Sequence, residues 1–199
     1  MMTLYSSQNC AECHVLRFLL AEKGVEYEVR FLEGDERQQE LLDLNPYSLV
    51  PTLVDRDLVL YETRVAAEYV DERFPHPPLM PLDPAGRAAT RLAVFRVLHD
   101  WYSLWPDLVN PDSRRRREAR KALRERLLAG SAVFGARRYF LSDEFSLVDA
   151  FVAPMLWRLP FFQVELPADA GVIEQYAAQV FARPAFQQSL TPAEQAMRG

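Results

Sequence analysis

The sequence predicts an α/β domain followed by an all-α domain. Three features of the 199-residue chain support this division. Residues 2–31 indicate a strand, a helix and a second strand, and two apolar runs further on have the pattern of a β-hairpin. Strand signals then stop at a proline-rich segment, residues 75–86, and only helical patterns follow it.

The first strand–helix–strand unit is predicted from hydrophobic periodicity. Residues 2–6 form a short apolar run, and residues 11–23 carry a wide apolar helical face that ends before Gly24. In residues 25–31 apolar and charged side chains alternate, which indicates a strand. A helix between two strands implies a parallel strand pair with a right-handed crossover.

The rest of the first domain follows the order of thioredoxin. Residues 35–45 predict a short helix, and two apolar runs surround Arg56 and Asp57 as the strands of a hairpin would. Residues 62–74 predict a closing helix with one apolar face. We therefore expect a thioredoxin-like domain over residues 1–78.

A segment dense in proline follows this domain. Prolines occupy positions 75, 77, 78, 81 and 84. Proline fixes φ and restricts the residue before it, so the segment should be extended and stiff. We place the interdomain linker at residues 79–84.

The remaining residues, 85–199, predict a helical domain. Ser146 would cap the helix that follows it, and Asp149 three positions on completes a variant of the capping box. The predicted helices cover residues 86–109, 114–134, 146–159 and 172–182.

Composition describes a mildly acidic globular protein. The net charge is −5, with 26% charged and 49% hydrophobic residues, and bulk charge gives no indication of nucleic-acid binding. The first ten residues lack a basic segment, and Arg17 interrupts the apolar run after Val15. We therefore expect no secretory signal peptide, no membrane span and a cytoplasmic location.

Both cysteines occur in one motif, Cys10-Ala-Glu-Cys13, which His14 follows. Haem attachment requires export and structural zinc commonly requires two ligand pairs, so neither suits this chain. A thiol redox centre stays open, because a helix N-terminus at Cys10 favours a thiolate, whereas Glu12 opposes one. We expect no metal ion and no catalytic residue, with Cys10 and Cys13 as the alternative catalytic pair.

Several blocks of sequence resemble a known family. A thioredoxin-like unit, a linker and a helical domain resemble the layout of cytosolic glutathione transferases. The blocks LAEKGV, VPTLVDRDL, DERFPHPPLMP and YFLSDEFSLVD are similar to the stringent starvation protein A family of RNA polymerase-associated proteins. The resemblance implies a glutathione transferase-like fold and a protein that binds RNA polymerase and regulates transcription under stress. It also implies a homodimer, or a heterodimer with a paralogous subunit of the same fold, and little or no transferase activity.

The same resemblance marks a vestigial glutathione site. Val50-Pro51 stands where the transferase fold keeps a cis-proline loop, and Glu62-Thr63 stands where transferases have Glu or Gln followed by Ser at a helix start. The backbone of Val50 could pair with a peptide-like ligand, and Glu62 and Thr63 could hold its ammonium and carboxylate. Alternatively, Pro51 only shapes the loop and Thr63 only caps the helix. We expect no cofactor, and glutathione, if it binds, should not turn over.

The proline-rich segment is the expected partner-binding surface. Prolines lose little conformational entropy on binding, and apolar neighbours could serve as anchors. A rigid domain connector is the alternative on physical grounds, and the family resemblance favours recognition of RNA polymerase. The expected partner-binding residues are Phe74, Pro75, His76, Pro77, Pro78, Leu79 and Met80.

Two other segments favour structural roles. Residues 113–126 hold eight basic residues and two glutamates. Such a segment could contact phosphate groups, but it more often forms a solvated helix face with ion pairs across its turns. Direct nucleic-acid contact is therefore not expected. The aromatic side chains of residues 99–106 stand where transferases bind their hydrophobic substrate, and we expect them in the core or a dimer interface instead.

Two classes of function stay open. The first is a non-catalytic binding module with a transferase fold, acting on RNA polymerase. The second is a glutathione-dependent transferase or thiol oxidoreductase that uses Cys10 and Cys13.

Overall fold

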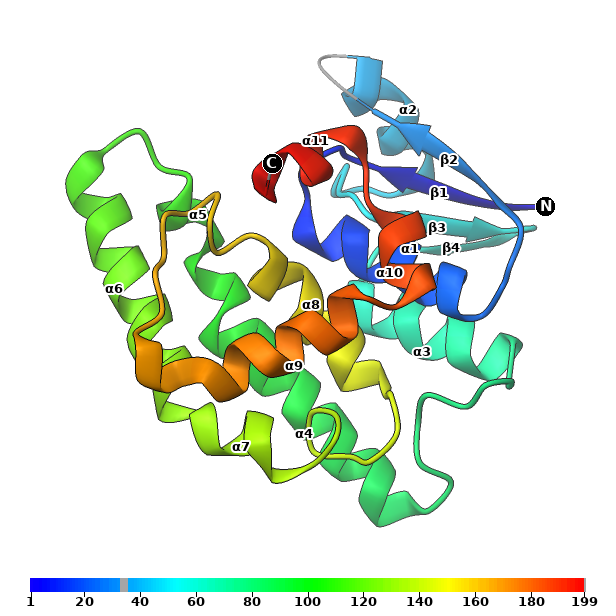
Figure 1. The fold of residues 1–199 in the computed structure, drawn as a ribbon. Coiled ribbons are helices and arrows are strands. Elements are labelled where there is room, and N and C mark those ends of the chain that lie inside the picture. Colours follow the sequence, from blue (N-terminus) through cyan, green and yellow to red (C-terminus); the bar gives the residue numbers. More distant parts are fainter. Residues whose placement is uncertain (33–35, 199) are drawn as a thin grey trace. The chain divides into compact units, whose positions relative to one another are not determined.

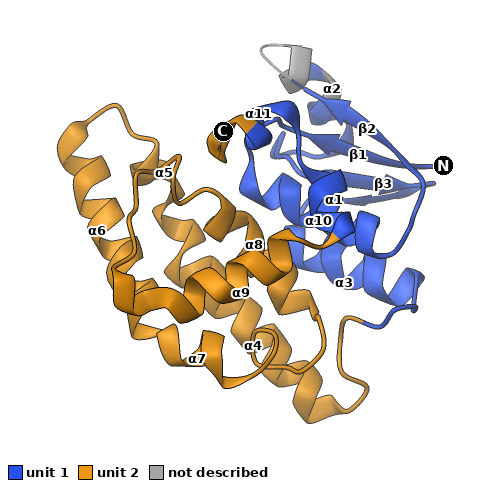
Figure 2. Ribbon diagram, in the orientation of Figure 1, with its two compact units in different colours: residues 1–78, 184–195 blue, residues 79–183, 196–199 orange. Residues whose placement is uncertain are grey.

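The structure of the protein is a computed structural model, and it describes residues 1–32 and 36–198 (Figure 1). The chain forms two compact units (Figure 2). Unit 1 holds residues 1–78 and 184–195, and unit 2 holds residues 79–183 and 196–199.

Within the described part of unit 1, four strands form one sheet in the order β2-β1-β3-β4. The first strand pairs in parallel with β2 and antiparallel with β3, and β3 pairs antiparallel with β4. The expected parallel pair and hairpin are therefore confirmed. The strands are β1 (Met2–Ser6), β2 (Tyr27–Phe31), β3 (Thr52–Asp55) and β4 (Leu58–Leu60).

Helices cover both faces of this sheet (Figure 1). The buried helix α1 packs against α3 and α10, and Gly24 adopts φ +62° just after it, which glycine tolerates without strain. Towards α2, the buried side chains of Tyr5, Leu32 and Leu41 form a separate apolar cluster. The helices of unit 1 are α1 (Ala11–Glu22), α2 (Glu36–Leu44), α3 (Thr63–Arg73), α10 (Pro184–Ser189) and α11 (Pro192–Gln195).

The last two helices of unit 1 come from the far end of the sequence. A buried ion pair holds them to α1, because Nη2 of Arg17 donates to both carboxylate oxygens of Glu194 at 2.7 Å. The Nε atom of Arg17 also donates to the Ser189 carbonyl at 2.9 Å, and the ring of His14 lies 2.9 Å from the Ser189 hydroxyl. These polar groups satisfy one another where water is excluded. Residues 184–195 therefore belong to unit 1, whereas the sequence analysis expected them in the helical domain of residues 85–199.

Unit 2 is helical, as expected. Its helix α8 is buried along its whole length and packs against α4 and α9. The predicted capping box at its start is confirmed, since Ser146 and Asp149 exchange the expected hydrogen bonds. The α-helices of unit 2 are α4 (Pro84–Asp100), α5 (Trp105–Leu108), α6 (Ser113–Ala129), α7 (Ser131–Ala136), α8 (Leu147–Trp157) and α9 (Gly171–Phe181). Its 3₁₀ helices are η1 (Tyr102–Leu104), η2 (Ala168–Ala170) and η3 (Ala196–Arg198).

Two of the predicted long helices are each broken in the structure. Instead of continuing to residue 109, α4 ends at Asp100, where Trp101 is buried and the hydroxyl of Tyr102 donates to the Phe151 carbonyl at 2.7 Å. Gly130 separates α6 from α7. In the first case packing of aromatic side chains overrides helix propensity, and in the second glycine ends the helix.

Among the described residues, no helix is both long enough and apolar enough to span a bilayer.

Candidate functional site

The proline-rich segment lies on the surface at its first part. The side chains of Pro75, His76, Pro77 and Pro78 are exposed, and the peptide bond between His76 and Pro77 is cis. Phe74 is half-buried at the end of α3, and its N–H donates to the Val70 carbonyl at 3.0 Å. Four consecutive residues, three of them prolines, are therefore exposed. We call residues 75–78 the proline loop.

A buried lysine holds the proline loop in place. The Nζ atom of Lys23 donates to the Asp71 carboxylate and to the Pro77 carbonyl, both at 2.5 Å. The Lys23 side chain has no exposed area and that of Asp71 has 7%. Because a charged group removed from water needs both an opposite charge and hydrogen bonds, this pair fixes the backbone of the loop against α1 and α3.

Leu79 and Met80 are buried, whereas their expected role as anchors for a partner requires them to be exposed. Their exposed fractions are 3% and 5%. The Leu79 carbonyl accepts a hydrogen bond from the Leu147 N–H at 2.8 Å, at the start of α8. Both residues belong to unit 2 and are buried, which corrects their expected exposure.

The cysteine motif forms the start of α1. Cys10 is the N-cap, and its sulfur accepts a hydrogen bond from the Cys13 N–H at 3.3 Å. Both cysteines are free thiols, and Cys13 is fully buried. Burial, and after it the hydrogen bond with Cys10, raises the pKa of the Cys13 thiol well above its usual value. Cys13 is therefore held as a neutral thiol, which is a poor nucleophile.

In a Cys10→Ser variant, we expect the remaining Cys13 thiol to react with a disulfide reagent at pH 7 far more slowly than free cysteine does. The raised pKa leaves little thiolate until the pH approaches that higher value, and burial also blocks the reagent. The measurement is the time course of thiol release, native and in denaturant. Fast reaction of native Cys13 at pH 7 would identify a redox centre.

The cis-proline loop has the geometry that the resemblance implies. The Val50–Pro51 peptide bond is cis, and Pro51 is buried at the start of β3. The side chain of Asn45 organises this loop: its amide donates to the Thr52 hydroxyl at 2.8 Å, and its carbonyl accepts from the N–H groups of Tyr47 and Leu49. The loop is therefore braced from within by a buried amide.

The Glu62-Thr63 pair is engaged in local contacts. Glu62, not Thr63, caps α3, since its carboxylate accepts from the Val65 N–H at 2.9 Å. The hydroxyl of Thr63 donates to the carboxylate of Glu12 at 2.5 Å. Glu12 therefore places a negative charge where Thr63 would offer a donor to the carboxylate of a ligand, and a second carboxylate there would be repelled.

The remaining candidate segments have structural roles. On α6, the exposed pairs Arg114–Glu118 and Lys121–Glu125 lie at 3.0 and 3.8 Å, as expected for a solvated helix face. Trp101 stacks on the ring of Phe134 in the core, with 6.2 Å between ring centroids. In the described part of the chain, no three His, Cys, Asp or Glu side chains gather in a way that could hold a metal ion.

Sequence reasoning did not identify Lys23, Asn45 or the pairing of Glu12 with Thr63 as parts of these sites. Lys23 was visible only as the last residue before Gly24, and its partners lie 48 and 54 positions away. For Asn45 a local signal existed, because an asparagine side chain commonly bonds to the backbone two residues on, as it does here with Tyr47. For Glu12 and Thr63 no signal in one sequence joins residues 51 positions apart.

Comparisons with known proteins agree with this architecture. The chain matches the family "Glutathione S-transferase, N-terminal domain" over residues 1–72 and "Glutathione S-transferase, C-terminal domain" over residues 88–184. It is 48% identical over 192 residues to the stringent starvation protein A homolog of Haemophilus ducreyi, covering 95% of this chain and 89% of that protein. The homolog of the same name in Coxiella burnetii is 40% identical, with 99% and 95% covered.

Solved structures show the same fold. The theta class glutathione S-transferase of Xanthomonas axonopodis pv. citri, with glutathione bound, superposes with a TM-score of 0.85 at 22% identity. The match covers 96% of this chain and 97% of that one. The expected glutathione transferase-like fold is therefore confirmed.

Proposed function

Because this chain belongs to the stringent starvation protein A family, built on the fold of the glutathione S-transferases, we propose that it is a non-catalytic binding protein that associates with RNA polymerase. In this proposal it acts in the cytoplasm and regulates transcription under stress. The observation that carries the proposal is the proline loop.

The physical properties of the proline loop support a role in recognition. Its side chains are exposed, and its backbone is held by the buried Lys23–Asp71 pair through the Pro77 carbonyl. A preorganised loop loses little conformational entropy when it binds, so most of its contact energy is available as affinity. The partner surface of the proposal comprises Pro75, His76, Pro77 and Pro78, with Phe74 at its edge.

The thiol and glutathione residues support a non-catalytic role. Cys13 is buried with a raised pKa, and the Thr63 hydroxyl already donates to the Glu12 carboxylate. A transferase needs an activated thiol or a thiolate of glutathione held by fixed donors. In the described arrangement, the Cys13 thiol is buried with a raised pKa, and the Thr63 hydroxyl is already bonded to Glu12.

We further propose self-association, or association with a paralogous subunit of the same fold. On α4, the side chains of Leu92 and Phe95 are 61% and 47% exposed, and the Phe95 ring stacks on His99 with 5.5 Å between centroids. Residues three positions apart lie on one helix face. Large apolar side chains that are exposed together are more common at interfaces than on free surfaces.

Replacing Pro75, His76, Pro77 and Pro78 together by Ala is expected to weaken binding to purified RNA polymerase. A hot spot at this loop would cost about 2–4 kcal/mol, or roughly 30- to 1000-fold in Kd. The measurement is a binding titration. The matched control is Arg56→Ala with Asp57→Ala, two exposed residues in the hairpin turn of the same unit.

Two further results complete this experiment. A variant with Cys10→Ser and Cys13→Ala should bind like wild type, although loss of the buried Cys13 sulfur should lower its melting temperature. All variants should keep the wild-type circular dichroism spectrum and sedimentation behaviour. A folded loop variant that binds as tightly as wild type contradicts the assignment of the surface. A monomeric wild-type protein at micromolar concentration contradicts the proposed self-association.

Turnover of glutathione with a chlorodinitrobenzene-type electrophile is expected to stay at the uncatalysed rate. The reason is the Glu12 carboxylate at Thr63, which opposes binding of a second carboxylate. Absorbance of the conjugate measures the rate, with a known transferase as positive control. A rate well above background that Cys10→Ser abolishes would establish the alternative function, a transferase or thiol oxidoreductase.

A further inference from the structure

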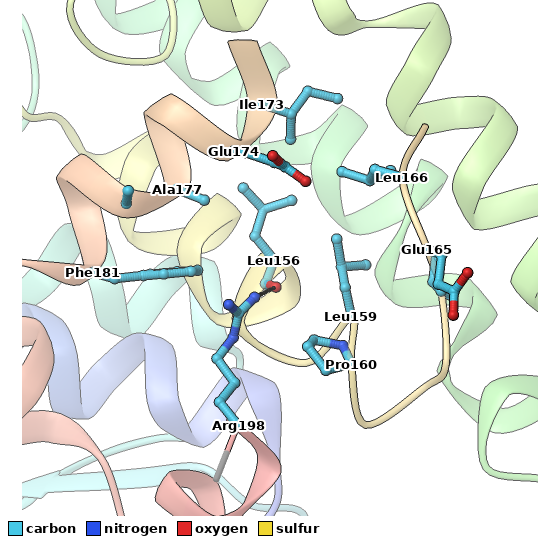
Figure 3. Close-up of a pocket in the computed structure, with 12 residues that line it drawn as sticks. Leu156, Leu159, Pro160, Glu165, Leu166, Ile173, Glu174, Ala177, Phe181 and Arg198 are labelled. Carbon is cyan, nitrogen blue, oxygen red and sulfur yellow. Dashed lines mark hydrogen bonds between the residues drawn. The ribbon is translucent and has the colours of Figure 1, made fainter. Parts of the chain in front are cut away.

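A pocket of about 430 Å³ lies within unit 2 (Figure 3). Apolar side chains of α8, of the loop after it and of α9 line most of it, among them Leu156, Leu159 and Ile173. Three charged residues line it: the cation Arg198 and the two carboxylates Glu174 and Glu165. Its volume falls within the range of small-molecule sites, roughly 300–1,000 Å³.

Arg198 is held rigidly at this pocket. Its Nε donates to the Trp157 carbonyl and one Nη to the Leu156 carbonyl, both at 2.8 Å. The guanidinium also lies over the rings of Trp157 and Phe181, at 5.0 and 4.7 Å from their centroids. These contacts occupy one edge of the guanidinium. Within the described residues, its Nη1 makes no hydrogen bond, so this donor remains for a ligand.

Glu174 offers the opposite charge. It lies in the first turn of α9, where the helix dipole favours a carboxylate, and it is exposed. No ion pair or hydrogen bond of its side chain occurs in the part of the chain that the structure describes. In Figure 3 the Glu174 carboxylate and the Arg198 guanidinium lie on different sides of the Leu156 side chain.

We propose that this pocket binds an amphipathic zwitterion, the class to which short apolar peptides belong. The carboxylate of the ligand would accept from Arg198, its ammonium would pair with Glu174, and its apolar body would pack on Leu156, Leu159 and Ile173. Arginine suits this role because its planar donors match a carboxylate.

Ligands of other classes fit the pocket less well. A plain hydrocarbon would remove both charged groups from water without replacing their hydrogen bonds, which is unfavourable. A fatty acid would satisfy Arg198 and leave its apolar end beside the Glu174 carboxylate. Capping of α8 by Arg198 explains the bonds to the Leu156 and Trp157 carbonyls, but not the opposite charge at the other side of the apolar lining.

The test is calorimetric titration of the full chain with dileucine and trileucine, each also in N-acetylated and C-amidated form. At least one free peptide is expected to bind, and each blocked form of it to bind at least tenfold more weakly. Glu174→Gln should remove the difference between the free and the N-acetylated peptide. Since Glu174 is exposed on α9, this variant should keep the wild-type circular dichroism spectrum.

A second pair of variants locates the binding site. Ala177→Leu places a larger side chain in the pocket and should abolish binding, whereas Gln175→Leu, an exposed position of the same helix outside the lining, should not. The proposal is overturned if neither free peptide binds, if Ala177→Leu binds like wild type, or if the blocked peptides bind as tightly as the free ones.

Discussion

Replacing Glu194 by Ala is expected to lower the free energy of unfolding by about 3–5 kcal/mol, the usual cost of breaking a buried ion pair. Glu194 has no exposed area, and its carboxylate accepts from Arg17 and from the Thr191 N–H. Without it, the Arg17 guanidinium would stay buried in unit 1 with its main opposite charge removed. An uncompensated charge in a low-dielectric environment is the origin of the loss.

Urea unfolding followed by circular dichroism measures this effect. The matched control is Gln195→Ala, the exposed neighbour in the same helix, which should change stability by less than about 0.5 kcal/mol. A double variant, Arg17→Met with Glu194→Leu, should recover much of the loss, because an apolar pair carries no desolvation cost. If Glu194→Ala is as stable as the control, the pair does not hold α11 to unit 1.

The Lys23→Met variant is expected to lose about 3 kcal/mol or more of stability for the same reason. Methionine keeps the apolar stem but leaves the Asp71 carboxylate, with 7% exposure, without this ammonium. The Pro77 carbonyl also loses its donor, so the proline loop should sample more conformations. If the proposed function holds, affinity for RNA polymerase should fall as well.

A double variant separates the two effects of Lys23. Combining Lys23→Met with Asp71→Leu removes the unpaired charge, so stability should largely return, while the Pro77 carbonyl still lacks its donor. Polymerase affinity should then stay low in a stable protein. Lys121→Met, at an exposed lysine of α6, is the control for loss of a positive charge. Full affinity in the stable double variant would show that Lys23 does not position the loop.

The parts of the fold that sequence predicted well are those with local signals. Alternation in residues 25–31 indicated β2, and Ser146 with Asp149 indicated the start of α8. In each case the pattern reflects which side chains face the core within a few residues of one another. The proline-rich segment was likewise recognisable from composition alone, because proline acts on its own backbone.

In the segment after Pro184, the sequence held a local signal for two helices that the analysis missed. It held no signal for where those helices pack. No helix is predicted after residue 182, yet Pro184 and Pro192 are the first residues of α10 and α11, a position that proline favours. Thr191 with Glu194 also forms a capping pair at α11. That these helices pack on α1 could not be predicted, since the contact joins residues more than 170 positions apart.

The sequence predicted which residues of the candidate site are exposed, but not which of their neighbours are buried. Exposure of Pro75–Pro78 follows from a stiff, proline-dense segment. Burial of Leu79 and Met80 depends on parts of the chain far away in sequence, such as Leu147, whose N–H donates to the Leu79 carbonyl. Apolar residues beside an exposed loop give no local indication of the direction in which they point. Only the three-dimensional arrangement decides which of them reach a partner.

The origin of α10 and α11 has a consequence for how the protein is made. The ribosome releases the amino end first, so Arg17 emerges long before the carboxylate that neutralises it. At roughly 5–20 residues per second, about 6–23 s of translation separate residue 78 from residue 194. During that time the thioredoxin-like segment exists as a nascent chain without two of its helices. Its final charge balance is reached only when synthesis is nearly finished, after the sequence of unit 2 up to residue 183 has been made.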